Sequence, residues 1–160
     1  MRGFPVSVLP IAFPVTKSTV ASNRRLHFLD TNILLYSISG DPSEASKHTR
    51  AIDLLDRDDG ALSAQVLQEF YVQATRATRP DAISHLDAVA LMATWRRFAI
   101  QELTLDVLDS ALNIKVASGF SYWDSAILAA AATLGCRELY SEDLTHGRMI
   151  EGVRVINPFR

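Results

Sequence analysis

Four acidic side chains stand where an α/β protein of alternating strands and helices places its chemistry. They are Asp30, Glu69, Asp124 and Asp143. Asp30 and Asp143 each follow an expected strand, so both should lie in the crevice beyond the carboxyl ends of a parallel sheet. Asp124 lies three residues after Ser121 in an expected helix, whose geometry directs the side chain toward the same edge. Glu69 shares a helix face with Gln65 and Gln73, which forms a polar stripe toward the crevice.

Carboxylates that come from separated elements are suited to binding Mg²⁺ or Mn²⁺. Mg²⁺ prefers hard oxygen ligands and keeps several water molecules, so such a site stays open to a phosphate oxygen. Two ions about 3.5 to 4 Å apart can stabilise both the attacking water and the leaving oxygen of a phosphodiester. No His or Cys set has the spacing of a zinc site, and the chain has no P-loop and no G-x-S-x-G or G-x-G-x-x-G motif. The four acids therefore predict metal-assisted phosphodiester hydrolysis, with one ion or two.

Each of these acids also has a structural alternative. Asp124 forms a capping box with Ser121, Glu69 could be a solvated helix residue, and Asp143 could cap a short turn. Asp30 is harder to explain in this way, because an acid directly after an apolar strand is costly to bury without a partner. The four acids in this order favour the functional interpretation.

The pattern of apolar residues predicts strands that alternate with helices. Strands are expected at 26–29, 61–62, 98–101, 138–141 and 153–156, and helices from about 33 and over 41–56, 63–74, 80–93, 103–119 and 121–135. This alternation predicts a three-layer α/β/α fold with a mainly parallel central sheet of about five short strands. The helix at 121–135 is almost entirely small and apolar, so we expect most of its surface to be buried.

Length and composition indicate one folded domain. The chain has 160 residues, of which 48% are hydrophobic. Three prolines and the absence of periodicity predict that residues 1–23 are a flexible extension and not a secretion signal, so that the domain occupies 24–160. The net charge of −2 does not by itself indicate a nucleic-acid binder, so any contacts with a nucleic acid must be local. No apolar run approaches the roughly 18 residues that span a bilayer. Cys136 is the single cysteine of the chain and cannot form an internal disulfide, which is consistent with a protein of the reducing cytoplasm.

The residues around the four acids resemble the PIN-domain family, and most closely the bacterial VapC-type toxins. The resemblance covers residues 26–160 and rests on the blocks FLDTN (28–32), SAQVLQEF (63–70), YWDSAI (122–127) and YSEDL (140–144). It implies that Asp30, Glu69 and Asp124 are the core metal ligands and that Asp143 fills a fourth acidic place, for which the adjacent Glu142 is an alternative. It also implies that three polar residues support the ligands: Thr31, Asn32 and Ser141.

The resemblance further implies an activity and partners. These are endoribonuclease cleavage of tRNA, mRNA or rRNA, a homodimer, and inhibition by an antitoxin that covers the active site, as in a type II toxin–antitoxin pair. We expect the dimer or antitoxin interface along the helices that contain Tyr71 and residues 86–92. The alternative is a catalytically silent PIN scaffold that only binds RNA or protein.

Two other protein classes fit the sequence less well. A phosphatase of the haloacid dehalogenase type also has an Asp after its first strand, but it needs a second acid two residues later, where this chain has Asn32. A receiver-like signalling domain would need an adjacent acidic pair early in the chain and a late Lys. No Lys occurs after Lys115.

Overall fold

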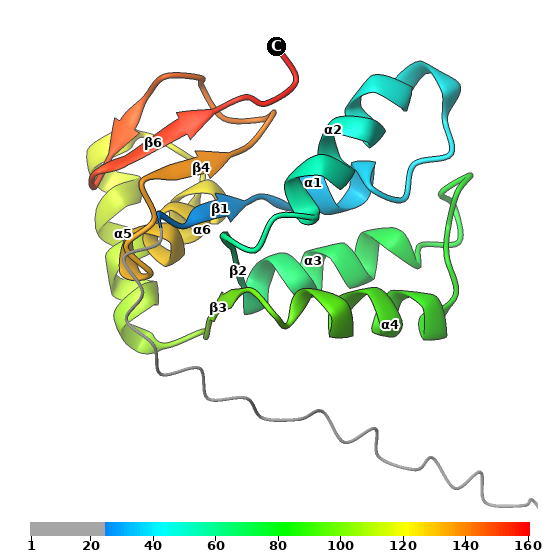
Figure 1. The fold of residues 1–160 in the computed structure, drawn as a ribbon. Helices are drawn as coiled ribbons and strands as arrows, with labels where there is room; N and C mark the ends of the chain where they lie inside the picture. Colours follow the sequence, from blue (N-terminus) through cyan, green and yellow to red (C-terminus); the bar gives the residue numbers. More distant parts are fainter. Residues whose placement is uncertain (1–24) are drawn as a thin grey trace, which may run out of the picture.

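A sheet of six short strands forms the centre of the protein, whose computed structural model describes residues 25–160 (Figure 1). The strands, in the order in which they lie in the sheet, are β3 (Ala99–Gln101), β2 (Gly60–Ser63), β1 (His27–Leu29), β4 (Glu138–Tyr140), β6 (Val153–Ile156) and β5 (Met149–Ile150). All neighbouring strands pair in parallel except β5 and β6. The predicted mainly parallel sheet is therefore confirmed. The extension predicted at residues 1–23 lies outside the described residues.

The prediction of about five strands is short by one, because β5 was not expected. The two-residue loop Glu151-Gly152 turns β5 back onto β6, and its residues have φ values of 49° and 79°. Positive φ at both positions is what a type I′ hairpin loop requires, and Gly152 adopts it without a steric penalty. A strand of two residues is too short to show an alternating pattern in the sequence.

Helices connect the first four strands along the chain, whereas β4, β5 and β6 follow one another without a helix. The helices are α1 (Thr31–Tyr36), α2 (Ala45–Leu55) after a 3₁₀ turn at Pro42–Glu44, α3 (Ala64–Ala74), α4 (His85–Trp95), α5 (Leu105–Ser118) and α6 (Tyr122–Thr133). The predicted N-cap at Ser63 is present, since its Oγ accepts a hydrogen bond from the backbone N–H of Val66. Gly119 ends α5 in the left-handed conformation, with a φ of 76°.

The helix predicted from Pro80 begins later, at His85. The guanidinium of Arg79 donates two hydrogen bonds to the carboxylate of Asp81, at 2.5 and 3.2 Å, and holds this segment in a turn. Ser84 is the N-cap of α4 instead, because its Oγ accepts a hydrogen bond from the N–H of Asp87 at 3.1 Å. The predicted start was wrong because a local ion pair and a better N-cap determine the boundary.

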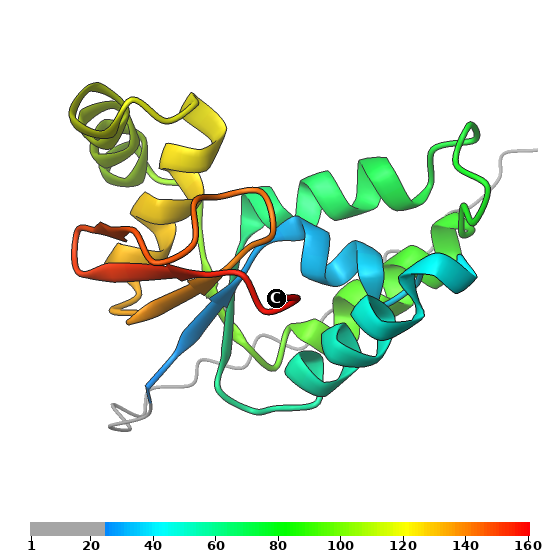
Figure 2. The same ribbon diagram turned by 90° about the horizontal axis from the view of Figure 1, so that it is seen from above.

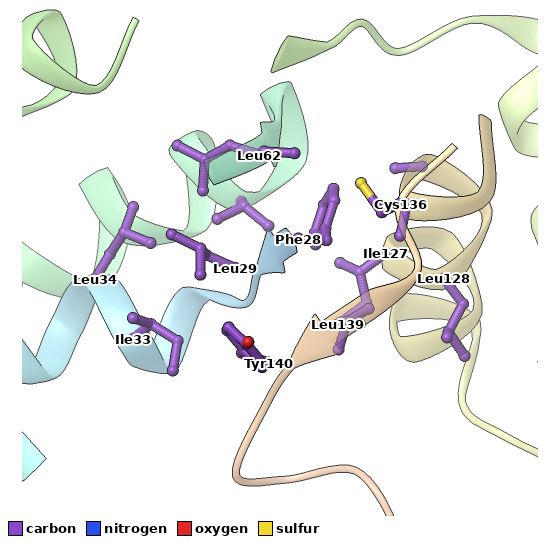
Figure 3. Close-up of a cluster of buried hydrophobic side chains, with 14 of the residues drawn as sticks. Phe28, Leu29, Ile33, Leu34, Leu62, Ile127, Leu128, Cys136, Leu139 and Tyr140 are labelled. Atoms are coloured by element: carbon purple, nitrogen blue, oxygen red, sulfur yellow. The ribbon is translucent and has the colours of Figure 1, made fainter. Parts of the chain in front are cut away.

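Helices cover both faces of the sheet, as a three-layer fold requires. Figure 2 shows the pair α5 and α6 on one side and the group α1 to α4 on the other. Phe28 and Leu29 of the central strand β1 are both buried, and in Figure 3 Phe28 points toward Ile127 of α6 whereas Leu29 points toward Leu34 of α1. Such two-sided burial is typical of parallel sheets. The predicted burial of the apolar helix is confirmed in α6, where every residue of 125–131 is buried.

The carboxyl ends of β1 and β4 lie side by side and bring distant residues together. Leu29 pairs with Tyr140, the last residue of β4, and the N–H of Asp30 donates to the carbonyl oxygen of Tyr140 at 3.0 Å. Asp30 and Ser141 therefore leave the sheet at the same edge. Within residues 25–160 no helix has the length and apolarity needed to cross a membrane.

Candidate metal and catalytic centre

A cavity of about 230 Å³ opens at this edge of the sheet, and all four predicted acids line it. We call it the acidic cavity. Its walls consist of Asp30, Thr31, Asn32, Leu35, Gln65, Glu69, Gln73, Trp123, Asp124, Ile127 and Asp143. No Lys or Arg is among these lining residues, so the four carboxylates share the cavity with no cationic side chain in its wall. The polar stripe predicted on α3 contributes Gln65, Glu69 and Gln73.

Asp30 is the most enclosed of the four acids, with 8% of its surface exposed. Its Oδ1 accepts the backbone N–H of Thr31, and its Oδ2 accepts the hydroxyl of Ser141, both at 2.7 Å. Burial raises the pKa of Asp30 to about 6, although these two hydrogen bonds oppose the rise. The negative charges of Asp143 and Glu69 raise it further. Ionised Asp30 is therefore poorly compensated by its protein neighbours, and a bound cation would stabilise it.

Asn32 connects two of the acids through its side-chain amide. Its Nδ2 lies 3.3 Å from Oδ2 of Asp30, 3.2 Å from Oδ2 of Asp143 and 3.5 Å from Oγ of Ser141. All three neighbours are oxygens, which assigns the amide nitrogen to this side. The carbonyl oxygen Oδ1 of Asn32 is buried and has no hydrogen-bond partner among the described residues. Asn32 therefore holds the carboxylates of Asp30 and Asp143 in place through its amide nitrogen.

Glu69 is held at both of its carboxylate oxygens. Thr31 Oγ1 donates to Oε2 at 2.9 Å, and Gln65 Nε2 donates to Oε1 at 2.8 Å from one turn earlier on α3. Thr31 is the first residue of α1, so this contact ties α1 to α3 across the cavity. The side chain of Glu69 thus has a defined orientation in the wall of the acidic cavity.

Asp124 both caps the start of α6 and lines the acidic cavity. Its N–H donates to Oγ of Ser121 at 3.1 Å, and the Ser121 hydroxyl donates to its Oδ2 at 2.7 Å. The predicted pairing of Asp124 with Ser121 at the start of α6 is therefore present, and the side chain also lines the acidic cavity. The two interpretations offered by the sequence do not exclude each other.

The structure distinguishes the two candidates for the fourth acidic place. Asp143 lines the acidic cavity, and its N–H donates to Oγ of Ser141 at 3.2 Å. Glu142 does not line it, and its carboxylate instead accepts hydrogen bonds from the hydroxyl of Tyr36 and the ammonium of Lys47. By position, Asp143 is the acid that joins the other three.

The residues present fit a hydrated divalent cation. Within the described range no three acidic, histidine or cysteine side chains are already close enough together to hold a metal ion. Mg²⁺ does not require such a cluster, because it is usually bound by one or two carboxylates and keeps several waters. Buried Asp30 and three further carboxylates line the cavity and supply only hard oxygen donors, which suits Mg²⁺ or Mn²⁺ and not Zn²⁺.

Sequence reasoning gave no role to three residues that line the acidic cavity: Leu35, Trp123 and Ile127. Trp123 is the most prominent of them, because it is 62% exposed although it is large and aromatic. Its position directly before Asp124, in the first turn of an expected helix, was the available signal.

Comparisons with known proteins identify the fold. The family model described as "PIN domain" matches residues 27–149. A toxin–antitoxin complex from Klebsiella pneumoniae is 21% identical, with a TM-score of 0.62 over 82% of this chain and 97% of that chain. FitAcB from Neisseria gonorrhoeae is 18% identical, with a TM-score of 0.60 over 84% of this chain and 99% of that one.

A third similar structure is VapC20 from Mycobacterium tuberculosis, described as a sarcin-ricin loop cleaving toxin. It is 21% identical, with a TM-score of 0.57 over 73% of this chain and 91% of that chain. No curated protein sequence matches the chain. At these identities the similar structures show a shared fold.

Proposed function

Because the chain belongs to the PIN-domain family, we propose that it is a metal-dependent endoribonuclease that hydrolyses RNA phosphodiester bonds. One observation carries this proposal: Asp30, Glu69, Asp124 and Asp143 line a single cavity that has no basic side chain in its wall. A silent PIN scaffold is the alternative. It is less well supported, because a buried and uncompensated Asp30 is a cost to stability that a bound cation would offset.

The arrangement supports a task for each residue in the proposed reaction. When bound, Mg²⁺ or Mn²⁺ would polarise a phosphate oxygen and lower the pKa of an attacking water. Asp30 and Asp124 are the side chains that would hold the ion, and Glu69 and Asp143 would complete its oxygen shell directly or through water. Thr31, Asn32 and Ser141 hold the carboxylates by the hydrogen bonds described above. Four carboxylates repel a phosphate, so RNA binding should depend on prior binding of the cation.

We further propose that the chain is the toxin of a type II toxin–antitoxin pair in the cytoplasm. The similar structure from Klebsiella pneumoniae is itself a toxin–antitoxin complex, which supports an antitoxin protein as a partner. A homodimer is proposed as well. The exposed apolar side chains of Val72 on α3 and Leu86 on α4 support the interface expected along these two helices.

Cleavage of single-stranded RNA by the purified full-length chain tests the proposed activity. We expect cleavage with Mg²⁺ or Mn²⁺ and none with EDTA. Asp124→Asn should lower the cleavage rate by more than the roughly 10- to 100-fold that is lost when a residue supporting a metal ligand is removed. Asp53→Asn is the matched control, because Asp53 is exposed on α2 and does not line the acidic cavity. RNA binding without cleavage under any metal condition would favour the silent scaffold.

A further inference from the structure

A second cavity, of about 420 Å³, adjoins the acidic cavity. We call it the side cavity. It is enclosed by the start of α3, by the segment from Gln101 to Leu108 and by the start of α6. Gln65 and Trp123 line both cavities, so they form a common wall between them. A ligand with one group in the acidic cavity can therefore reach into the side cavity past Trp123.

The walls of the side cavity combine an aromatic surface with amide groups. Trp123 is 62% exposed, and its ring meets Tyr122 edge to face, with ring centroids 5.1 Å apart. Three primary amides also line the cavity, from Gln65, Gln68 and Gln101. The amide nitrogens of Gln65 and Gln101 donate to Glu69 and to the carbonyl oxygen of Glu102, which leaves their amide oxygens as acceptors. Glu102 is the one charged residue among its lining residues, so the side cavity does not attract a phosphate.

These properties match an unpaired nucleobase. A base has two apolar faces that stack on aromatic side chains, and an edge of donors and acceptors that amide groups can contact. The volume falls within the range of about 300 to 1,000 Å³ that is typical of small-ligand pockets. In RNA each base is joined through its ribose to a phosphate, so a strand with its phosphate in the acidic cavity carries a base close to the common wall.

We propose that the side cavity binds one nucleobase next to the cleaved bond, stacked on Trp123 and read at its edge by the amide of Gln68 and the amide oxygens of Gln65 and Gln101. The inference rests on the proposed ribonuclease function and makes Trp123 a specificity-determining residue. Exposed leucines at the rim, Leu103 and Leu105, would also suit a protein partner. The wall shared with the acidic cavity favours the base, because it links the side cavity directly to the phosphate-binding place.

Cleavage of a random-sequence RNA pool, followed by sequencing of the cut ends, tests the proposal. Trp123→Ala should raise KM by about 5- to 150-fold and weaken the base preference beside the cut, because stacking on one aromatic ring is lost. Trp123→Phe should restore most of both. Met149→Ala, at an exposed apolar residue on β5, should change neither. An unchanged KM and base preference in Trp123→Ala would overturn the inference.

Metal dependence shows whether Trp123 acts on the base or only supports its neighbour Asp124. The Mn²⁺ concentration that gives half-maximal cleavage should be the same in Trp123→Ala and in the wild type. If this concentration rises while the base preference is unchanged, Trp123 supports Asp124 and the inference fails. The oligomeric state of the Leu105→Asp variant tests whether the side cavity binds a protein instead of a base. A dimer that becomes a monomer with unaltered cut sites would make the side cavity a protein interface.

Fluorescence tests base binding without requiring cleavage. The chain has two tryptophans, and Trp95 is 4% exposed, so an added ligand mainly quenches Trp123. In the wild type with Mn²⁺, a single-stranded tetraribonucleotide should quench this emission in stopped-flow mixing before it is cleaved, and the same oligonucleotide without its bases should not. Quenching in a chain that never cleaves RNA would support the base site while refuting the ribonuclease. Cleavage by the wild type without base-dependent quenching would refute the base site alone.

Discussion

Two groups of carboxylates at the carboxyl edge of the sheet differ in whether they have a cationic partner. Glu142 accepts hydrogen bonds from Lys47 and Tyr36, and together these contacts outweigh its partial burial and lower its pKa. Asp30, one strand away, has no cation beside it, and burial raises its pKa to about 6. The paired carboxylate fixes a loop, whereas the unpaired one faces a cavity with three more acids. Missing compensation, more than acidity itself, distinguishes the candidate site.

The largest expected effect is on catalysis. Asp30→Asn should abolish metal-dependent RNA cleavage while the circular dichroism spectrum stays native, because the variant loses a charge and keeps an oxygen that can accept the N–H of Thr31. Glu142→Gln should keep most of the activity, since Glu142 does not line the acidic cavity. Cleavage rates of the two variants under identical conditions make the comparison. Wild-type activity in Asp30→Asn would refute the site assignment.

The lack of a cationic partner at Asp30 should also affect how the stability of the protein depends on pH. An ordinary Asp in the unfolded chain has a pKa of 3.8, so the folded state holds this proton more tightly. Without metal, protonated Asp30 therefore contributes about 3 kcal/mol to the free energy of unfolding at low pH. This contribution is lost as the pH rises from about 4 to about 6.

Urea denaturation of wild type and Asp30→Asn in EDTA isolates this effect. The free energy of unfolding of Asp30→Asn minus that of the wild type should be larger at pH 7.5 than at pH 4. Asp53→Asn, exposed on α2, controls for the loss of a carboxylate elsewhere. A difference between wild type and Asp30→Asn that does not depend on pH would mean that the pKa of Asp30 is ordinary.

Metal binding should partly reverse that loss of stability. A cation that binds the folded cluster and not the unfolded chain stabilises the protein by roughly 2.7 kcal/mol at 100 times its Kd. Thermal melts in EDTA and then in a Mn²⁺ series measure this shift. Asp143→Asn should respond less to Mn²⁺ than wild type, and Glu142→Gln should respond equally. Equal shifts in wild type and Asp143→Asn would remove Asp143 from the site.

The sequence predicted the parts of this molecule that depend on local patterns. Asp30 could be found because it follows an apolar strand, and α6 because its residues are small and apolar. The pairing of Lys47 with Glu142 could not be predicted, since the two residues are 95 positions apart and meet only through the fold. The same contact resolves which of Glu142 and Asp143 faces the cavity. The sequence likewise shows a Trp next to Asp124, but it could not predict that Trp123 lines two adjoining cavities.

The smallest expected effect concerns the compensated carboxylate. Lys47 and Glu142 are about one third and one quarter exposed, so solvent screens their attraction, and the pair should contribute no more than about 1 kcal/mol. The Lys47 ammonium also lies 4.7 Å from the centre of the Tyr36 ring, and this contact adds to the anchoring of α2 against α1.

A double-mutant cycle of Lys47→Met and Glu142→Gln, measured by urea denaturation, gives the coupling energy of this pair. Arg50→Met is the control on the same helix, at an exposed position. We expect a coupling energy below about 1 kcal/mol and RNA cleavage within a few-fold of wild type, because the pair fixes the loop that carries Asp143 without lining the acidic cavity. If Lys47→Met instead lost cleavage as completely as Asp30→Asn, the pair would belong to the catalytic centre. The distinction between compensated and uncompensated carboxylates would then fail.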